Sequence, residues 1–435
     1  MKKKKNKKKV RTIQVDYLAR VEGEATLYIQ LEDEKIREVK LKIFEPPRFF
    51  EAFLRGRNFA EAPDITARIC GICPVAYQMS SVHAMENAFG VQVEGALRDL
   101  RRLIYCGEWI ESHSLHIYML HAPDFLGYPD AVRMAKDHPE IVKRGLGLKK
   151  VGNEIISLLG GREIHPINVK VGGFYRTPTR KELQVLLPSL EKAREAALET
   201  LHWAAQFDFP DFEQDYEFVA LSHTEEYPFN EGRIISNRGL DISVEEFEDY
   251  FQEQQVEYSN ALHCLLRGKP YFVGPMARFN LNFEKFSPVV QQAANSIGLL
   301  PGLKNPFKSI LVRSLEVLHA CEEALRIVQN YQEASSATIK ISASAGKGYA
   351  CTEAPRGLLY HRYHINSQEL IEEAKIVPPT SQNQKIIEDD LFKLLEHSLH
   401  LEEEKLQEYC EHAVRNYDPC ISCATHFLKL QVERK

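Results

Sequence analysis

The chain has 435 residues, of which 44% are hydrophobic and 27% charged, as is typical of a globular protein with a large buried core. Its net charge of −6 hides an asymmetry, because the opening MKKKKNKKKV carries seven lysines and no acid, so the rest of the chain sums to −13. An acidic body excludes an extended nucleic-acid groove, and no apolar run approaches the roughly 18 residues of a membrane-spanning helix.

The basic N-terminal segment, residues 1–11, is interpreted as a disordered, solvated tail, with a membrane or polyanion contact as the less favoured alternative. Neither a continuous apolar stretch nor a small-residue cleavage site follows it, so it does not resemble a signal peptide. We therefore expect a cytoplasmic protein, unless a partner subunit carries an export signal for both chains. No Pro, Gly or Ser linker divides the sequence, and residues 12–426 are predicted to form one domain.

The predicted elements begin with a β-hairpin over residues 25–44, where apolar and polar residues alternate around the turn EDEK. The next is a helix from about Val75, which follows a tight turn. A second hairpin, turning at NSQ, is predicted near residues 349–377. Apolar residues at three- and four-residue spacing predict long helices over 94–121, 181–207, 244–258, 284–298, 307–333 and 385–416. The fold class is therefore mainly α (α+β), a bundle of long helices with small peripheral β-hairpins or sheets.

Four of the nine cysteines form two Cys-x-x-Cys pairs near opposite ends of the chain. RICGIC holds Cys70 and Cys73, DPCISCATH holds Cys420 and Cys423, and 347 positions separate Cys73 from Cys420. Grouped thiolates are soft ligands that favour zinc, iron or nickel. The pairs of a structural zinc site usually lie within ~15–20 residues of each other, so a shared catalytic metal is favoured here. A long-range zinc site and two pairs that never meet remain as alternatives.

The other cysteines do not form such pairs, and an odd total without small-domain spacing argues against a disulfide framework. Four of them lie in helical or apolar surroundings and are expected to be buried thiols: Cys106, Cys264, Cys321 and Cys410. Proline disfavours helical geometry in the residue before it, so the last helix should end before Asp418 and Pro419. The second pair is therefore expected in a turn just beyond that helix.

The sequences around both pairs resemble those of the nickel-iron hydrogenase large subunit. The resemblance extends over nearly the whole chain, in the order of that family, through ARVEGE (19–24), EPPRFFE (45–51), ESHSLHIYMLHAPDFLGYP (111–129), EAPRG (353–357) and KIVPPTSQN (375–383). The motifs PRFFE, LHAPDFLGYP and VPPTSQN are most similar to the corresponding sequences of the soluble, reversible hydrogenases linked to NAD(P), also described as sulfhydrogenases.

The resemblance implies a nickel-iron centre that forms between the N- and C-terminal regions of the chain. All four paired cysteines would bind nickel. By motif position, Cys70 and Cys420 would be terminal ligands, while Cys73 and Cys423 would bridge nickel to iron.

The iron of this family carries carbon monoxide and cyanide, which need an apolar cage with a few donors. Leu359, Val377 and Pro378 match the cage positions, and Thr380 offers a hydroxyl. Arg356 would lie above the metals. From the residues alone, the favoured interpretation of APRG is a turn that ends a strand and presents a solvated arginine.

The implied activity is heterolytic cleavage of H2, in which a base next to the metals takes one proton. The Cys420 thiolate or the Arg356 guanidinium would be that base, and Glu22 matches a carboxylate that relays the proton outward. Asp124 and Asp418 match carboxylates that orient and tune the site. Without the resemblance, Glu22 is a surface glutamate and Asp418 a turn residue before proline.

The end of the chain carries two further implications. Glu51 and His426 match ligands of a magnesium ion, together with a backbone carbonyl near Lys375 or Ile376. A maturation peptidase of this family removes the residues beyond the C-terminal histidine, so residues 427–435 are expected to be a propeptide.

Three histidines and two unusual positions are not assigned as metal ligands. His113, His116 and His121 lie on one predicted helix and are interpreted as structural or surface histidines. Two positions depart from many relatives, which have histidine where this chain has Glu24 and Tyr77. These departures leave the expected ligands intact but put redox tuning and oxygen tolerance in doubt.

The chain has no dinucleotide-binding glycine motif, no Walker loop and no further grouped cysteines for iron-sulfur clusters. Electrons are therefore expected to leave through an iron-sulfur small subunit, with flavin, NAD(P) and further iron-sulfur sites on other subunits. Three alternatives remain: a deazaflavin- or heterodisulfide-reductase-linked hydrogenase, a respiratory-complex subunit of the same fold, and a zinc-binding interaction protein. The four retained cysteines argue against the respiratory subunit.

Overall fold

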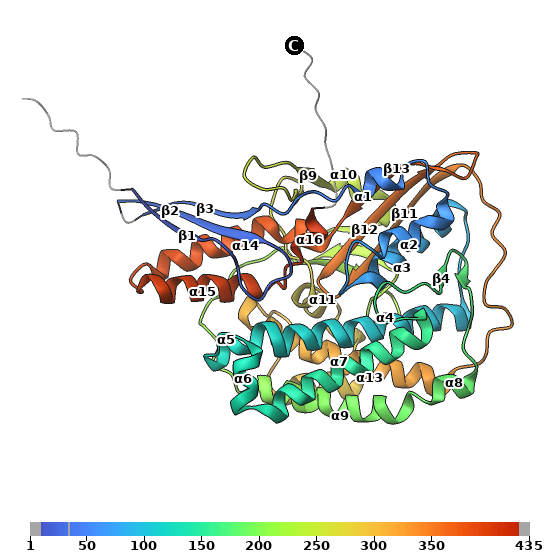
Figure 1. The fold of residues 1–435 in the computed structure, drawn as a ribbon, viewed down its shortest axis with the longest axis horizontal. Helices are drawn as coiled ribbons and strands as arrows, with labels where there is room; N and C mark the ends of the chain where they lie inside the picture. Colours follow the sequence, from blue (N-terminus) through green and yellow to red (C-terminus); the bar gives the residue numbers. More distant parts are fainter. Residues whose placement is uncertain (1–9, 34, 426–435) are drawn as a thin grey trace, which may run out of the picture.

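The computed structural model describes residues 10–33 and 35–425 as a layer of long helices beneath several small sheets (Figure 1). Two helices of the lower layer, α4 and α7, approach each other closely, because a Cβ on Gly152 would lie 2.5 Å from the carbonyl oxygen of Gly107. Glycine is what permits such contact between backbones. The layer consists of α4 (Gly95–Leu115), α7 (Pro139–Gly160), α9 (Leu187–Ala204) and α13 (Ser309–Asn330).

The N-terminal sheet is antiparallel, in the order β1 (Val10–Val15), β2 (Ala25–Glu32) and β3 (Lys35–Ile43). Buried and half-buried residues alternate along β2, as expected for a sheet with one face on the core. That face packs against α14 (Pro379–Ser398).

The C-terminal sheet is also antiparallel, in the order β11 (Gly346–Ala354), β12 (Gly357–Ile365) and β13 (Ile371–Val377). It packs against α3 (Pro74–Ala88), the helix that follows the first cysteine pair. The second pair lies at α16 (Ile421–Ala424), beyond α15 (Glu403–Arg415).

The remaining elements are short and lie around these layers. The strands are β4 (Val169–Lys170), β5 (Gly173–Phe174), β6 (Val219–Ser222), β7 (Arg233–Ser236), β8 (Asp241–Ile242), β9 (Phe251–Gln254) and β10 (His263–Leu266). The helices are α1 (Phe50–Leu54), η1 (Phe59–Glu61), α2 (Ala62–Thr66), η2 (His116–His121), α5 (Ala122–Leu126), α6 (Ala131–Asp137), α8 (Arg180–Gln184), η3 (Val244–Glu246), α10 (Phe247–Tyr250), α11 (Pro275–Asn282), η4 (Phe283–Lys285), α12 (Pro288–Ser296) and η5 (Pro306–Lys308).

The mainly helical fold class with small antiparallel sheets is confirmed. Both predicted hairpins form, and the second gains a preceding strand, β11. The helices predicted over 181–207 and 385–416 are each two helices, and that over 284–298 begins with the short η4. The helix α7 was not predicted, because four glycines reduce its helical propensity.

Two predictions are wrong. The segment 244–258 is not one helix, because the chain becomes strand β9 after Tyr250 and pairs with β10. Its four-residue aromatic spacing misled the prediction, since Phe247 and Phe251 stack across this transition with ring centroids 4.4 Å apart. The tail over 1–11 also ends too late, because Val10 and Arg11 belong to β1, while residues 1–9 lie outside the described residues.

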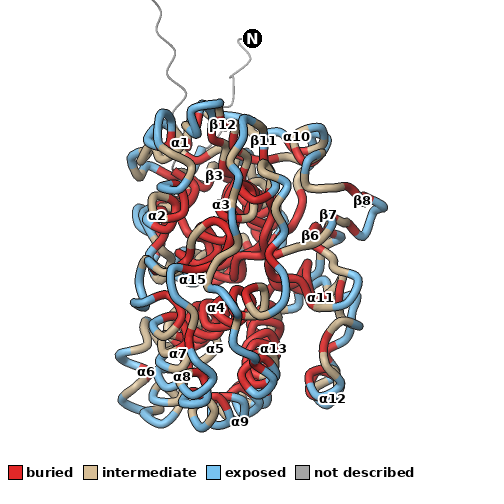
Figure 2. Tube along the Cα trace, turned by 90° about the vertical axis from the view of Figure 1, so that its right-hand side faces the viewer, coloured by how far each residue is buried: buried red, intermediate tan, exposed pale blue. Residues whose placement is uncertain are grey.

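An N-terminal and a C-terminal segment of the described chain meet in the interior. Glu22 forms a parallel β-bridge with Cys420, and the Ile421 amide donates to the Glu22 carbonyl at 2.9 Å. One hydrophobic cluster extends from Ile13 in β1 to Ala424 in α16, and buried residues fill both layers (Figure 2). No helix among the described residues is long and apolar enough to cross a membrane.

Candidate metal centre

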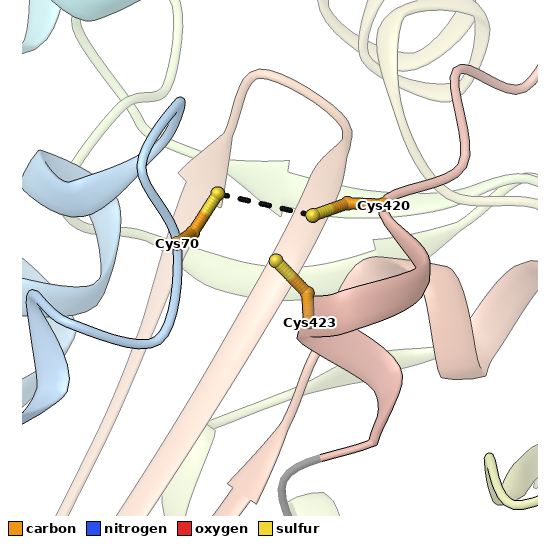
Figure 3. Close-up of side chains that lie close together, drawn as sticks. All are labelled: Cys70, Cys420 and Cys423. Carbon is orange, nitrogen blue, oxygen red and sulfur yellow. Dashed lines mark hydrogen bonds between the residues drawn. The ribbon is translucent and has the colours of Figure 1, made fainter. Parts of the chain in front are cut away.

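The two cysteine pairs converge on one buried point. The sulfur atoms of Cys70, Cys420 and Cys423 all lie within 4.8 Å of one another, and Cys70 and Cys420 are 3.8 Å apart (Figure 3). The Cys73 thiol interacts with all three. We call these four residues, each at most 4% exposed, the cysteine cluster. The alternative in which the two pairs never meet is therefore wrong.

Local structure positions each thiol. Cys70 lies in the turn before α3, and the backbone amides of Ile72 and Cys73 donate to its sulfur at 3.3 and 3.1 Å. Cys73 is the N-cap of α3, with Pro74 as the first helical residue. Cys420 precedes α16, and its backbone amide donates to the Thr380 hydroxyl at 3.0 Å. The predicted turn beyond a helix end is confirmed for Cys420, and a short helix follows it.

The four thiols have very different proton affinities. Burial raises the pKa of Cys70, but hydrogen bonds with the other three thiols and the charge of Arg356 outweigh it and hold that pKa well below the ordinary value. Burial and hydrogen bonds from the other thiols raise the pKa of Cys420 well above it. The cluster thus favours one thiolate, and four buried thiolates together require a bound cation.

Glu22 connects the cluster to a less buried region. Its Oε2 accepts from the Cys420 thiol at 3.1 Å and from the Ser422 amide at 3.0 Å. Its side chain is half-buried. The next residue, Gly23, has φ of 86°, and a Cβ there would lie 2.6 Å from the Ile421 Cβ. Glycine at this position therefore allows the glutamate to approach Cys420.

Arg356 lies in the turn between β11 and β12 and is 3% exposed, so the alternative of a solvated arginine is wrong. Its Nε donates to the Asp418 carbonyl at 2.7 Å, and its Nη2 to Asp418 Oδ1 at 3.1 Å. Its Nη1 is buried and has no hydrogen-bond partner among the described residues. Asp418 has φ of 50°, a left-handed conformation next to Pro419.

The predicted cage residues are all buried but lie on different faces. Leu359 shares a hydrophobic cluster with the four cysteines, whereas Val377 belongs to a second cluster with Leu358 and Tyr360. This follows from strand alternation, because Val377 pairs with Tyr360. Pro378 is the N-cap of α14 and is buried.

Asp124 lies in a different environment from Asp418. Its Oδ1 accepts from Arg20 at 2.5 Å and from Arg415 at 2.7 Å, and its Oδ2 accepts from Arg415 at 2.7 Å. Burial raises its pKa, but the two guanidiniums outweigh this and hold the pKa below the ordinary value. Its described contacts are thus with Arg20 and Arg415, and not with the cysteine cluster.

Glu51 lies on α1, and its Oε1 accepts from the Ile376 amide at 2.8 Å. Its charge acts on Glu253, whose pKa is raised to about 8 by burial against the pull of Lys375. Sequence reasoning missed Glu253, because it lies on the unpredicted strand β9. His426 lies outside the described residues.

The three histidines on α4 and η2 are buried, which agrees with a structural role and not with a surface one. His113 Nε2 lies 2.9 Å from a Glu316 oxygen, and His116 Nε2 lies 2.8 Å from the Arg415 carbonyl. His121, with Asp124 and His412, forms a second group of possible ligands, but two arginines already occupy the carboxylate.

The two departures from many relatives differ in burial. Glu24 is exposed. Tyr77 is 1% exposed, one helical turn beyond Cys73, and its hydroxyl has no partner among the described residues. Burial and the charges of Cys423 and Cys73 raise the pKa of this phenol well above its ordinary value.

A family model described as nickel-dependent hydrogenase matches residues 48–144 and 223–426. The chain is 36% identical over 430 residues to the alpha chain of sulfhydrogenase 2 of Pyrococcus furiosus, covering 96% of this chain and 100% of that protein. It is 31% identical over 402 residues to a chain of the vhu F420-non-reducing hydrogenase of Methanocaldococcus jannaschii, covering 85% and 95%.

A solved structure has the same fold over nearly its whole length. An NAD+-reducing NiFe hydrogenase in its H2-reduced state matches with a TM-score of 0.87 and 25% identity, covering 96% of this chain and 99% of that one.

Proposed function

This chain belongs to the nickel-dependent hydrogenase family as a catalytic large subunit, and we propose that its cysteine cluster holds a nickel-iron centre that cleaves H2 reversibly. The observation that carries this proposal is the convergence of three buried sulfurs within 4.8 Å of one another, with which Cys73 also interacts. Glu22 lies on one side of this cluster, and Arg356 lies nearby. A nickel-iron centre, when bound, supplies the electron-pair chemistry that separates H2 into two protons and two electrons.

The residues present fit such a group. Soft thiolates favour nickel and iron, and a buried set of four requires a cation for charge balance. Cys70 and Cys420 would be the terminal nickel ligands, with Cys73 and Cys423 shared with iron. The buried, unpartnered Nη1 of Arg356 is a donor for small polar ligands such as cyanide, and Leu359 adds apolar surface for carbon monoxide.

Proton transfer is assigned to residues of this chain. The Cys420 sulfur takes a proton and passes it to Glu22 Oε2, 3.1 Å away. This distance lies within reach for a sulfur donor, so no rearrangement is needed between them. The Ser422 amide, 3.0 Å from the same oxygen, orients the carboxylate. Arg356 stays charged beside the cluster, because Asp418 and the thiolates outweigh burial and raise its pKa.

Further parts of the proposal concern partners and ions. Electrons pass to an iron-sulfur small subunit, then onward to NAD(P) on other subunits of a cytoplasmic complex. Glu51 and His426 bind magnesium near Ile376, with Glu253 in the surrounding shell of carboxylates. A maturation peptidase removes residues 427–435 after metal insertion. The F420-non-reducing relative makes a different electron acceptor the second candidate.

The test is H2 oxidation by the complex purified from its native host, assayed first with a viologen dye and then with NAD+, NADP+ and a deazaflavin. Dye reduction together with NAD(P) reduction supports the proposal in full. Dye reduction without NAD(P) reduction keeps the hydrogenase and rejects the proposed acceptor. A complex that contains nickel and iron but shows no H2-dependent dye reduction contradicts the proposal.

A further inference from the structure

A second arginine, Arg278 on α11, is fully buried and has every donor of its guanidinium occupied. Its Nε and Nη2 donate to the two oxygens of Glu316 at 2.8 and 2.7 Å. Its Nη1 donates to Glu353 Oε2 at 3.0 Å and to the Ala354 carbonyl at 2.9 Å, and its Nη2 also donates to the Pro355 carbonyl at 3.0 Å. Because arginine has five N–H donors, none remains for a ligand.

The last three of these bonds reach the residues that directly precede Arg356. Ala354 is the last residue of β11, and Pro355 begins the turn to β12. Without Arg278, their carbonyls would be buried without these charged donors. A guanidinium binds two neighbouring carbonyls with fixed geometry, which a more flexible ammonium does not reproduce. Arg278 therefore fixes the backbone that orients the Arg356 side chain.

Other buried residues fix Arg278 and its two carboxylate partners in place. Glu316 also accepts from the Tyr227 hydroxyl at 2.8 Å. The Trp109 ring lies 4.3 Å from the guanidinium, and its Nε1 donates to the Glu353 carbonyl at 3.0 Å. We call Arg278, Glu316, Glu353, Trp109 and Tyr227 the Arg278 cluster. Its members come from α4, α11, α13, β11 and the loop before β7. Elements from several parts of the fold therefore pack against this turn.

The start of α11 restrains the same turn on its other side. Gly274 has φ of 116°, and a Cβ there would lie 2.7 Å from the Arg356 carbonyl oxygen. Gly357 has φ of 132°, and a Cβ there would lie 2.8 Å from the Gly274 nitrogen. These two glycines bring the α11 segment into direct backbone contact with the Arg356 turn.

We propose that Arg278 is a positioning residue, which sets the place of the Arg356 guanidinium beside the cysteine cluster through the Ala354 and Pro355 carbonyls. This inference rests on the function proposed for Arg356. In that function, Arg278 contacts neither H2 nor metal, and it acts only through the turn.

The test compares R278K with R101K. Arg101 is a matched control, because it is equally buried and makes a bidentate pair with Glu86 at 2.7 and 2.6 Å and one bond to the Lys170 carbonyl. Hydrogen-deuterium exchange of full-length protein should be faster in the peptide spanning residues 353–358 of R278K, by roughly tenfold, and unchanged there in R101K.

Measurements of H2 oxidation then test whether Arg278 and Arg356 act together. We expect R278K to lower dye-linked H2 oxidation roughly 10- to 100-fold with nickel and iron content unchanged. In an R356K background, R278K should cause little further loss, because the group that it positions is already altered. W109F, which removes one bond to the Glu353 carbonyl, should give a smaller effect of the same sign and serves if R278K fails to fold.

Equal exchange and activity in R278K and R101K, or additive losses with R356K, would overturn the inference while the hydrogenase function stands. If the wild-type complex lacks H2-dependent activity, the proposed function fails, and faster exchange in the turn still reports whether Arg278 holds it.

Discussion

Two buried polar sites lie next to each other and differ in how fully their groups are paired. In the Arg278 cluster, all five donors of the arginine have partners, and Glu316 accepts from three hydrogen bonds. Around the cysteine cluster, Arg356 Nη1, Asp418 Oδ2 and the Tyr77 hydroxyl are buried without a partner among the described residues. Native proteins rarely leave buried polar groups unpaired, so such groups at this site have capacity for a ligand, an ion or water.

This difference distinguishes a site that holds the backbone in place from a site that binds ligands. A fully paired ionic cluster has no capacity left for a ligand but fixes the backbone around it. A buried site with four sulfurs requires a cation for charge balance, and its unpaired polar atoms leave capacity for a ligand. Substitutions at the cysteine cluster should therefore change metal content or the chemistry directly. Substitutions at fully paired sites should change stability, and those at the Arg278 cluster should change turnover only through the turn that holds Arg356.

The largest effect is expected from C420S. A serine hydroxyl is a hard donor and does not replace a thiolate for nickel, so the variant should lose nickel and all H2-dependent dye reduction. Cys321 provides the matched control, because it is fully buried in α13 away from the cluster. C321S should keep both nickel and activity, as measured by metal analysis and viologen assay. Retention of nickel by C420S would remove this cysteine from the ligand set.

The next effect is expected from E22Q. A glutamine does not take the proton that the Cys420 thiol donates to Glu22 at 3.1 Å, so H2/D2O exchange should fall about 100-fold. Nickel content should be unchanged. Glu24 is the control, because it is two residues away and exposed, and E24Q should exchange at the wild-type rate. Equal exchange rates in both variants would exclude Glu22 from the proton route.

A smaller change in activity is expected from D124N, although its effect on stability is large. The substitution removes the carboxylate that Arg20 and Arg415 share, although Arg415 keeps its pair with Glu411. This should lower the free energy of unfolding by on the order of 3 kcal/mol. Because Asp124 contacts no residue of the cysteine cluster, kcat should change less than about threefold at a temperature where the variant is folded. Denaturant unfolding and the dye assay measure the two quantities. A large loss of kcat with unchanged stability would contradict the conclusion that Asp124 supports stability and not turnover.

The last prediction concerns acid stability, which the ionisation of Glu316 affects. Burial raises its pKa, but Arg278 and His113 outweigh burial and lower the pKa from 4.5 to about 2. A folded-state pKa below the unfolded one stabilises the protein above about pH 4.5, and this contribution is lost as the pH falls toward 2. The shift corresponds to on the order of 3 kcal/mol.

E316Q should therefore be less stable than wild type near neutral pH, yet lose less further stability on acidification. Urea unfolding between about pH 6 and pH 3 measures this slope. The same slope in E316Q and wild type would show that Glu316 does not titrate with the shifted pKa.

The sequence motifs identified all four residues of the cysteine cluster but little of the Arg278 cluster. Cys-x-x-Cys pairs, Glu22 and Arg356 lie in short motifs whose spacing marks them. Arg278 and Glu316 lie 38 positions apart on different helices, and Trp109 is another 169 positions before Arg278, so no local pattern relates them. Their partnership depends on how α4, α11 and α13 pack.

Motif matching also gave Asp124 and Asp418 the same role, although their surroundings differ. Asp418 binds Arg356, whereas Asp124 binds Arg20 and Arg415. Both aspartates lie next to a proline, Asp124 after Pro123 and Asp418 before Pro419. Only tertiary structure decides which arginine each aspartate contacts. The fold class followed from helical periodicity, but helix α7 and strand β9 did not, because glycines and aromatic spacing obscured them.

The most direct measurement is the nickel, iron and zinc content of the protein purified from its native host, which supplies any maturation machinery. Four converging buried thiols, with an unpaired guanidinium donor nearby, predict nickel and iron bound in equal amounts with little zinc. Zinc alone would contradict this conclusion and make the cysteine cluster a structural link between the two ends of the chain.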